Sequence, residues 1–276
     1  MNPFQQKTWT LYRRTADRFP IVRKIMAPIR WYYHFNPISY GWHRLRGITY
    51  REWYAKQLDG FARSIGPPPM EGLEKQMGIF QLEYLRQHGL QHSHTLLDFG
   101  CGNLRAGIFF IEYLQPNCYV GVEISQGRLD QGKKRIEQFN LIEKGARLVC
   151  IQDLDLNDLV GQRFDFIWAQ GVLAHMPLED IERLFKNIHK VMHSDSVFFV
   201  NYGDGKGATY KTSLKDFYYD STTIPDLCSR YGLQQKRMAD WRHLWPHALQ
   251  DRDILLQVTL QPTNELVSNK MKGVTT

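Results

Sequence analysis

The stretch Leu96-Leu97-Asp98-Phe99-Gly100-Cys101-Gly102-Asn103-Leu104-Arg105-Ala106-Gly107 decides the fold. Its apolar start predicts a buried strand, its glycines predict a tight turn, and Leu104–Leu114 predicts a helix. Asp98 stands at the end of the strand, just before the glycines. A strand that passes through a glycine turn into a helix brings free backbone N–H groups to one point, and this order is typical of a nucleoside-binding pocket.

A second acid closes the next predicted strand and separates two classes of ligand. Glu123 ends the apolar stretch Cys118–Glu123, where a carboxylate can bind two ribose hydroxyls. A dinucleotide would place its pyrophosphate against the glycine turn, where Asp98 repels it. S-adenosylmethionine instead carries an α-ammonium and a sulfonium. Arg105 also stands where the dinucleotide pattern requires Gly or Ala, so a methyl donor is favoured over a nicotinamide.

These motifs resemble the Rossmann-like (class I) S-adenosylmethionine-dependent methyltransferases, from about Glu71 to Gln261. The pattern Asp98-x-Gly100-x-Gly102 matches the first motif of that family, with Leu104 in place of the usual third glycine. Three further stretches are similar to a bacterial branch with a Leu-Arg-Gly-Gly run in this loop: Leu104–Gly107, Leu73–Gln81 and Trp241-x4-Pro246-x3-Gln250. The resemblance implies S-adenosylmethionine as the cofactor.

The resemblance also implies which residues surround the cofactor. Asp153 would hydrogen-bond the adenine amino group with the backbone of Leu154 alongside, and Ile124 would pack on one face of the adenine. Arg105 would receive the methionine carboxylate or else project into solvent. Gln170 would line the cofactor or else cap the next helix. The expected cofactor-binding residues are Asp98, Gly100, Cys101, Gly102, Arg105, Glu123, Ile124, Asp153, Leu154 and Gln170.

His175 is the catalytic candidate. The Asn/Asp-Pro-Pro-Tyr/Phe run of many amino-group methyltransferases is absent after the strand Phe164–Gln170, which favours a hydroxyl acceptor. An imidazole can take the proton that a hydroxyl loses at neutral pH. The alternatives are that His175 only shapes the cofactor pocket, or that alignment and desolvation suffice without a base. No acids and histidines cluster at metal-ligand spacing, so no metal is predicted.

From Glu71 onward, apolar strand-like stretches alternate with amphipathic helical stretches, which is typical of a doubly wound parallel sheet. Helices are predicted at Leu73–His88, Leu104–Leu114, Gln126–Phe139, Leu178–Met192 and Pro225–Tyr231. Strands are predicted at Thr95–Phe99, Tyr119–Glu123, Arg147–Gln152, Phe164–Gln170, Val197–Tyr202, Gln234–Asp240 and Ile254–Gln261. The prediction is an α/β fold with a mostly parallel seven-stranded sheet, an antiparallel C-terminal hairpin and an N-terminal helical extension.

The chain divides into three predicted parts. Residues 1–69 form a basic, aromatic helical extension, with a helix at Tyr50–Ile65 and a Pro-rich linker. Residues 70–262 form the methyltransferase domain, and residues 263–276 form a flexible tail.

The positive charge of the chain lies in the extension. Residues 1–63 carry twelve Lys or Arg against three acids, so the remainder of this +7 chain is close to neutral. The extension could cap the active site, lie on anionic lipid at the inner face of the membrane, or track RNA phosphates. A lipid contact would suit a lipid-linked acceptor. A nucleic-acid partner is disfavoured because the domain shows no recognised RNA-binding module.

The remaining features predict a cytoplasmic enzyme. The four cysteines show no paired spacing, no run is apolar enough to span a bilayer, and the N-terminus lacks a signal-peptide core. The predicted activity is O-methylation of a small molecule or saccharide. The alternatives are an RNA methyltransferase and a catalytically silent membrane-associated protein, and a nicotinamide oxidoreductase is the weakest.

Overall fold

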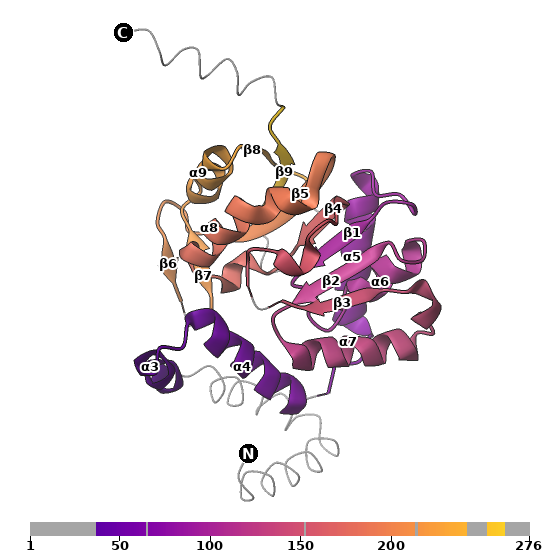
Figure 1. The fold of residues 1–276 in the computed structure, drawn as a ribbon, viewed down its shortest axis with the longest axis horizontal. Helices are drawn as coiled ribbons and strands as arrows, with labels where there is room; N and C mark the ends of the chain where they lie inside the picture. Colours follow the sequence, from indigo (N-terminus) through magenta and orange to yellow (C-terminus); the bar gives the residue numbers. More distant parts are fainter. Residues whose placement is uncertain (1–36, 65, 152, 213–214, 242–252, 263–276) are drawn as a thin grey trace, which may run out of the picture. The chain divides into compact units, whose positions relative to one another are not determined.

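The computed structural model describes residues 37–262 except 65, 152, 213–214 and 242–252 (Figure 1). It divides into two compact units, Met1–Phe61 and Ala62–Thr276, which are taken one at a time. The predicted tail and the first 36 residues of the extension lie outside the described residues, and the predicted domain boundaries stay predictions.

In the second unit, the described residues form one nine-stranded sheet in the order β3-β2-β1-β4-β5-β7-β6, with β9 pairing antiparallel to β5 and to β8. The strands are β1 Leu96–Phe99, β2 Tyr119–Glu123, β3 Arg147–Cys150, β4 Phe164–Ala169, β5 Met192–Asp204, β6 Tyr210–Lys211, β7 Phe217–Tyr219, β8 Leu233–Arg237 and β9 Asp253–Leu260. The helices are α5 Gly72–Gln87, α6 Gly107–Tyr113, α7 Gln126–Gln138, α8 Leu178–Asn187 and α9 Thr223–Arg230. This arrangement confirms the predicted α/β fold with a mostly parallel sheet and an antiparallel strand pair, but the sheet has nine strands and not the predicted seven, because β6 and β7 add to it.

Alternate residues along the central strands enter two separate hydrophobic clusters. Leu97 and Phe99 of β1 belong to one cluster. Leu96 of β1 and Trp168 of β4 belong to the other. The sheet is therefore buried on both faces, which is why β1, β2 and β4 read as near-continuous apolar runs. Helix α7 packs along β2 and β3, and α9 packs on β8 (Figure 1).

Three element boundaries differ from the predicted ones. Helix α6 begins at Gly107 rather than at Leu104, because Leu104 has a left-handed φ of 64° that no right-handed helix accepts. Helix α8 ends at Asn187, and β5 already begins at Met192. The hairpin of β6 and β7 was not predicted, since strands of two and three residues show no hydrophobic period.

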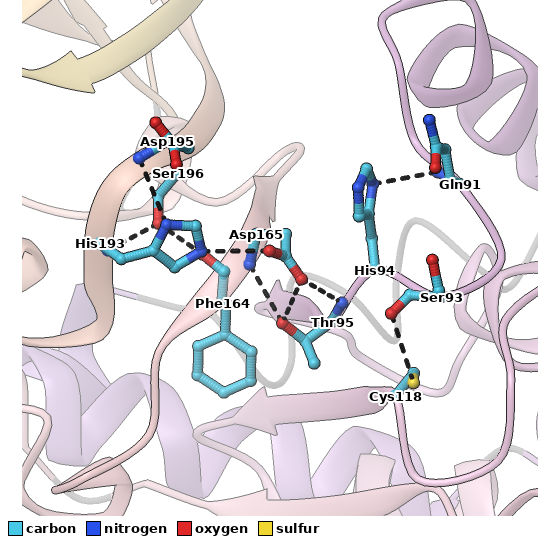
Figure 2. Close-up of polar contacts among 10 residues, drawn as sticks. All are labelled: Gln91, Ser93, His94, Thr95, Cys118, Phe164, Asp165, His193, Asp195 and Ser196. Carbon is cyan, nitrogen blue, oxygen red and sulfur yellow. Dashed lines mark hydrogen bonds and ion pairs between the residues drawn. The ribbon is translucent and has the colours of Figure 1, made fainter.

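At the amino edge of the sheet, Asp165 joins three neighbouring strands (Figure 2). Its Oδ2 accepts hydrogen bonds from the backbone N–H (2.7 Å) and hydroxyl (2.8 Å) of Thr95, which precedes β1. Its Oδ1 lies 3.1 Å from Nε2 of His193 in β5. Burial raises the pKa of Asp165, but the Thr95 bonds and the nearby histidines outweigh burial and leave the pKa lowered. This carboxylate fixes the register of β1, β4 and β5.

The same cluster holds a serine, a histidine and an aspartate, but not in nucleophilic order. Ser196 Oγ donates to the Phe164 carbonyl at 2.6 Å, away from the imidazole. The His193 ring accepts from the Asp195 N–H at Nδ1 and meets Asp165 at Nε2. Neither ring nitrogen receives the serine proton, so the cluster is structural.

The first unit consists, in its described part, of α3 (Pro37–Leu45) and the start of α4 (Tyr50–Ser64). A capping box begins α4: Thr49 N donates to Glu52 Oε2 at 2.8 Å, and Glu52 N donates back to Thr49 Oγ1 at 3.3 Å. Tyr40 of α3 packs against Tyr50 and Trp53 of α4. None of the described helices is long and apolar enough to cross a membrane.

Candidate active site

The glycine turn leaves β1 while still bonded to β2. The backbone N–H groups of Gly100 (2.8 Å) and Cys101 (3.0 Å) both donate to the Val122 carbonyl. Gly100 has a φ of 79°, and a Cβ there would stand 2.4 Å from Val172 Cγ2. The sequence motif thus has a steric cause: any side chain at this position collides with the loop that follows β4.

Leu104 takes the place of a third glycine and keeps a glycine-like conformation, with a φ of 64°. Its side chain is fully buried, and the missing side chains of Gly107 and Gly132 make room for it. A Cβ on Gly107 would lie 2.7 Å from Leu104 Cδ2, and one on Gly132 would lie 2.9 Å from Leu104 Cγ. Burial of this side chain offsets the backbone strain.

Glu123, at the end of β2, ties the glycine turn to the loop that begins α7. Its Oε2 accepts from Gly102 N at 3.0 Å, and its Oε1 accepts from the N–H groups of Ile124 (2.9 Å) and Ser125 (3.0 Å). A carboxylate offers about four acceptor positions, and three are used here. The buried Glu123 therefore keeps one position on Oε2 for a ribose hydroxyl, one fewer than the sequence suggested.

Asp98 lies buried under the glycine turn. Its Oδ2 accepts from the Tyr119 hydroxyl at 2.7 Å, and a Cβ on Gly107 would stand 2.5 Å from that hydroxyl oxygen. Burial raises the pKa of Asp98 to about 7, with a further increase from Glu123, while Tyr119 and Arg105 act in the opposite direction. The negative charge of a buried acid that receives few hydrogen bonds is stabilised when a cation binds nearby.

Arg105 lies in the turn before α6, not in a helix as predicted. Its Nη1 is 3.8 Å from Glu74 of α5, and its side chain is about one-third exposed. Burial lowers the pKa of Arg105, and the charge of Glu74 opposes this decrease. Gly78 of α5 allows this packing, because a Cβ there would stand 2.5 Å from the Arg105 carbonyl oxygen.

Helix α5 also supports the central strand β4 through Gln81. Gln81 accepts a hydrogen bond from the Trp168 indole N–H at 2.8 Å and donates to the Met77 carbonyl. Trp241 packs edge-on against Trp168, with ring centroids 5.9 Å apart. Pro246 and Gln250, the other two residues of the Trp241-x4-Pro246-x3-Gln250 motif, lie outside the described residues.

The remaining predicted cofactor residues lie at the carboxyl ends of β2, β3 and β4. Asp153 Oδ1 accepts from the Asp155 N–H at 2.9 Å and is part of a turn after β3. Leu154 buries its side chain in the core, so only its backbone can meet a ligand. Ile124 and Gln170 are partly exposed. Cys101 is buried, and a Cβ on Gly121 would stand 2.9 Å from its Sγ, so its thiol faces the sheet.

His175 ends the short 3-10 helix η3 (Leu173–His175) after β4. Its Nδ1 lies 2.6 Å from the Lys215 carbonyl and 3.5 Å from Asp216 Oδ1. A carbonyl oxygen only accepts, so Nδ1 carries the proton and the neutral ring has its lone pair on Nε2. Burial lowers the pKa of His175, and the charges of Lys215 and Arg128 lower it further.

Arg128 is a cation of the site that the sequence did not single out. Ser125, the N-cap of α7, accepts the Arg128 N–H at 3.2 Å. The Arg128 Nη1 stands 3.4 Å from where a Cβ on Gly102 would lie, and Arg128 interacts electrostatically with both Arg105 and His175. Its position in the first turn after the β2 acid is the signal that could have found it.

A polar relay missed by the sequence supports the loop after β4. The Gly171 N–H donates to Asn201 Oδ1 at 2.6 Å, and Asn201 Nδ2 donates to Asp253 Oδ2 at 3.2 Å. Burial raises the pKa of Asp253 to about 6. These residues come from β5 and β9, and only the folded sheet brings them beside Gln170.

The sheet order is that of the class I S-adenosylmethionine-dependent methyltransferase fold. Residues 97–198 match a family model described as a methyltransferase domain. The class predicted from the sequence is therefore confirmed.

Particular proteins share this domain. An uncharacterised protein of Rickettsia prowazekii is 24% identical over 183 residues, which are 66% of this chain and 64% of that protein, less than two thirds of its length. A sphingolipid C9-methyltransferase of Gibberella zeae is 25% identical over 41% of this chain and 22% of that protein. The structure of magnesium protoporphyrin IX methyltransferase from Synechocystis with bound S-adenosylmethionine is 13% identical, with 78% and 98% of the chains covered and a TM-score of 0.57, which shows a shared fold.

Proposed function

We propose that this chain is an S-adenosylmethionine-dependent methyltransferase that transfers a methyl group to an oxygen of a small molecule or saccharide. The observation that carries the proposal is the buried Glu123, which holds the glycine turn through Gly102 and keeps one acceptor position. The match to a methyltransferase domain supports it.

The residues around the turn fit this cofactor. Among the described residues, a Cβ on Gly102 would have two neighbours within 4 Å besides its chain neighbours: Arg128 Nη1 at 3.4 Å and Glu123 Oε2 at 4.0 Å. Ribose would bind Glu123, the methionine ammonium would lie towards Asp98, and the methionine carboxylate towards Arg105. Asp98 with a pKa near 7 gains from a cationic ligand, because the positive charge stabilises its ionised form.

The bound cofactor supplies a methyl group on a positively charged sulfur. In the transfer, the acceptor oxygen forms a bond to the methyl carbon as the carbon–sulfur bond breaks and its electrons go to sulfur. His175 accepts the hydroxyl proton at Nε2, since its Nδ1–H is held by the Lys215 carbonyl. Asp216, 3.5 Å from Nδ1, would stabilise the resulting imidazolium.

The acceptor and the location are further parts of the proposal. One relative is named for a sphingolipid, and a lipid-linked acceptor would suit the basic extension. All four cysteines are free thiols, as expected in the reducing cytoplasm.

The first experiment is a calorimetric titration with S-adenosylhomocysteine, with NAD as the competing ligand class. We expect micromolar affinity for S-adenosylhomocysteine, as is typical for a product complex of this size, and no heat from NAD. The double variant Asp98→Ala/Glu123→Ala should lose binding. Asp226→Ala/Glu137→Ala, which removes two acids away from the site, is the matched control.

Labelled methyl donor and fractionated small molecules then identify the acceptor, and His175→Gln tests the base. General-base catalysis contributes roughly 10²–10⁴-fold, so His175→Gln should lower the rate by about this factor while the affinity for S-adenosylhomocysteine stays within about twofold. Equal loss of rate and affinity would assign His175 to the cofactor pocket. A folded chain that binds NAD and not S-adenosylhomocysteine would contradict the proposed function.

A further inference from the structure

We propose that α3 and the turn after it form a docking surface for an anionic lipid bilayer. The surface, here called the α3 face, consists of Trp42 and Leu45 of α3 and of Arg46, which follows the helix. It belongs to the first unit and contains none of the predicted cofactor residues. The proposal therefore stands or falls separately from methyl transfer.

The apolar part of the α3 face is exposed although an aromatic core lies on the same helix. Trp42 is 61% exposed and Leu45 is 85% exposed. Residues three apart lie on one side of a helix, so the two side chains form a single apolar strip. Tyr40 points to the other side, where it packs 5.1 Å from the ring of Trp53. The helix is thus anchored from within while it presents a large aromatic and an aliphatic side chain outward.

The polar part of the α3 face is positive. The Arg46 guanidinium lies 5.9 Å from the centre of the Trp42 ring. From Arg18 to Arg51 the sequence contains seven Lys or Arg and no Asp or Glu. An anionic surface is the partner with complementary charge, because Lys and Arg side chains close to an anionic bilayer are attracted to it.

The combination favours a bilayer over RNA. Tryptophan prefers the membrane interface, and a leucine beside it can enter the acyl boundary, where its burial stabilises the bound state. RNA offers phosphates and base faces, which would use the arginines and the tryptophan but leave the leucine in water. The 85% exposed Leu45 is therefore the residue that distinguishes the two partners.

The test is co-sedimentation of the full chain with vesicles of phosphatidylcholine alone and of phosphatidylcholine mixed with phosphatidylglycerol. We expect binding to the mixed vesicles, at least about tenfold weaker binding to phosphatidylcholine, and weakening by salt. Trp42→Ser/Leu45→Ser and the arginine variant Arg46→Gln should each reduce the affinity, the first about tenfold or more.

The matched control is Ile142→Ser/Val160→Ser in the second unit, which removes two apolar side chains that are 62% and 73% exposed. This control should bind like the unaltered chain, and all variants should keep their circular dichroism and their affinity for S-adenosylhomocysteine. Equal binding by the control and the α3 variants would overturn the proposal. Tighter binding to polyuridylate, lost in the arginine variant but unchanged in Leu45→Ser, would overturn it in favour of RNA.

Discussion

The two edges of the parallel sheet each carry an aspartate, and the two carboxyls differ in what surrounds them. At the amino edge, Asp165 receives two hydrogen bonds from Thr95 and pairs with His193, and its pKa is lowered. At the carboxyl edge, the buried Asp98 receives one hydrogen bond among the described residues, from Tyr119, and its pKa is raised to about 7.

The difference separates an acid that holds the fold from an acid that is available to a ligand. The charge of Asp165 is compensated by the protein, so it stabilises the folded state at neutral pH. The charge of Asp98 is compensated poorly, so its ionised form opposes folding until a cation approaches. In the proposed function, the carboxyl edge therefore gives up stability for cofactor binding, and the amino edge contributes stability.

The largest effect on this comparison is expected from Gly100→Ala. The new Cβ would meet Val172 Cγ2 at 2.4 Å at a φ of 79°, which combines a clash with backbone strain. We expect the free energy of unfolding to fall by about 3 kcal/mol and the affinity for S-adenosylhomocysteine to be lost. Urea denaturation and calorimetry measure the two quantities.

Gly161→Ala is the control, because Gly161 precedes β4 with the same backbone strain, a φ of 80°, and nothing within 4 Å of a Cβ. Gly161→Ala should lower the free energy of unfolding by about 1 kcal/mol and leave the affinity for S-adenosylhomocysteine unchanged. Adding Val172→Ala to Gly100→Ala should restore the part of the free energy of unfolding that the clash removes. Equal losses for the two alanine variants would show that the collision with Val172 is not what requires glycine.

Asp98→Asn should weaken binding without weakening the fold. The amide can still accept from Tyr119, but it no longer attracts a cation, so the affinity for S-adenosylhomocysteine should fall about tenfold or more. Because the folded pKa of Asp98 is raised, its contribution to stability is present at low pH and is lost as pH rises through about 7. The variant should therefore be at least as stable as the unaltered chain at pH 8. A clear loss of stability at pH 8 would mean that ionised Asp98 is structural.

Asp165→Asn should do the reverse at the other edge. The substitution weakens the charge-assisted hydrogen bonds that Asp165 makes with Thr95 and His193. Because this carboxylate is about one-third exposed, we expect the free energy of unfolding to fall by only about 1 kcal/mol at pH 7. The folded pKa is lowered, so this contribution should disappear as pH falls below the ordinary range of an aspartate. Denaturation at several pH values tests the trend. A changed affinity for S-adenosylhomocysteine would show that the two edges are coupled.

The smallest effect is expected from Arg128→Met. The charge of Arg128 is one of the causes that lower the pKa of His175, so its removal should raise that pKa. Titration of the His175 ring by NMR measures the shift, and Lys236→Met on exposed β8 is the control. A downward shift would contradict the placement of Arg128 beside the imidazole.

The strands and the turn around the predicted cofactor residues could be predicted closely because their determinants are local. The strand, the glycine turn and the acid that ends β2 each leave a mark in a short window of sequence, and Glu123 bonds mainly to its own neighbours. The start of α6 was missed, because burial of Leu104 overrides the conformational preference of an isolated leucine.

The acceptor side and the amino edge could not be predicted in the same way. His175 is positioned by a carbonyl 40 residues away, in the short segment before β7, and Asp165 binds Thr95 across 70 residues. Arg128 reaches the site only because α7 turns back over Gly102. No periodicity marks such contacts, since they depend on which strands become neighbours.

The sequence by itself determined the class of fold, the order of its central elements and the chemistry of the cofactor turn, because apolar period, glycine spacing and charge act over a few residues. The tertiary structure decided which of two aspartates is compensated, which nitrogen of His175 carries the proton, and which faces of α3 meet solvent. These properties depend on burial and on distant partners, which exist only after the sheet has assembled.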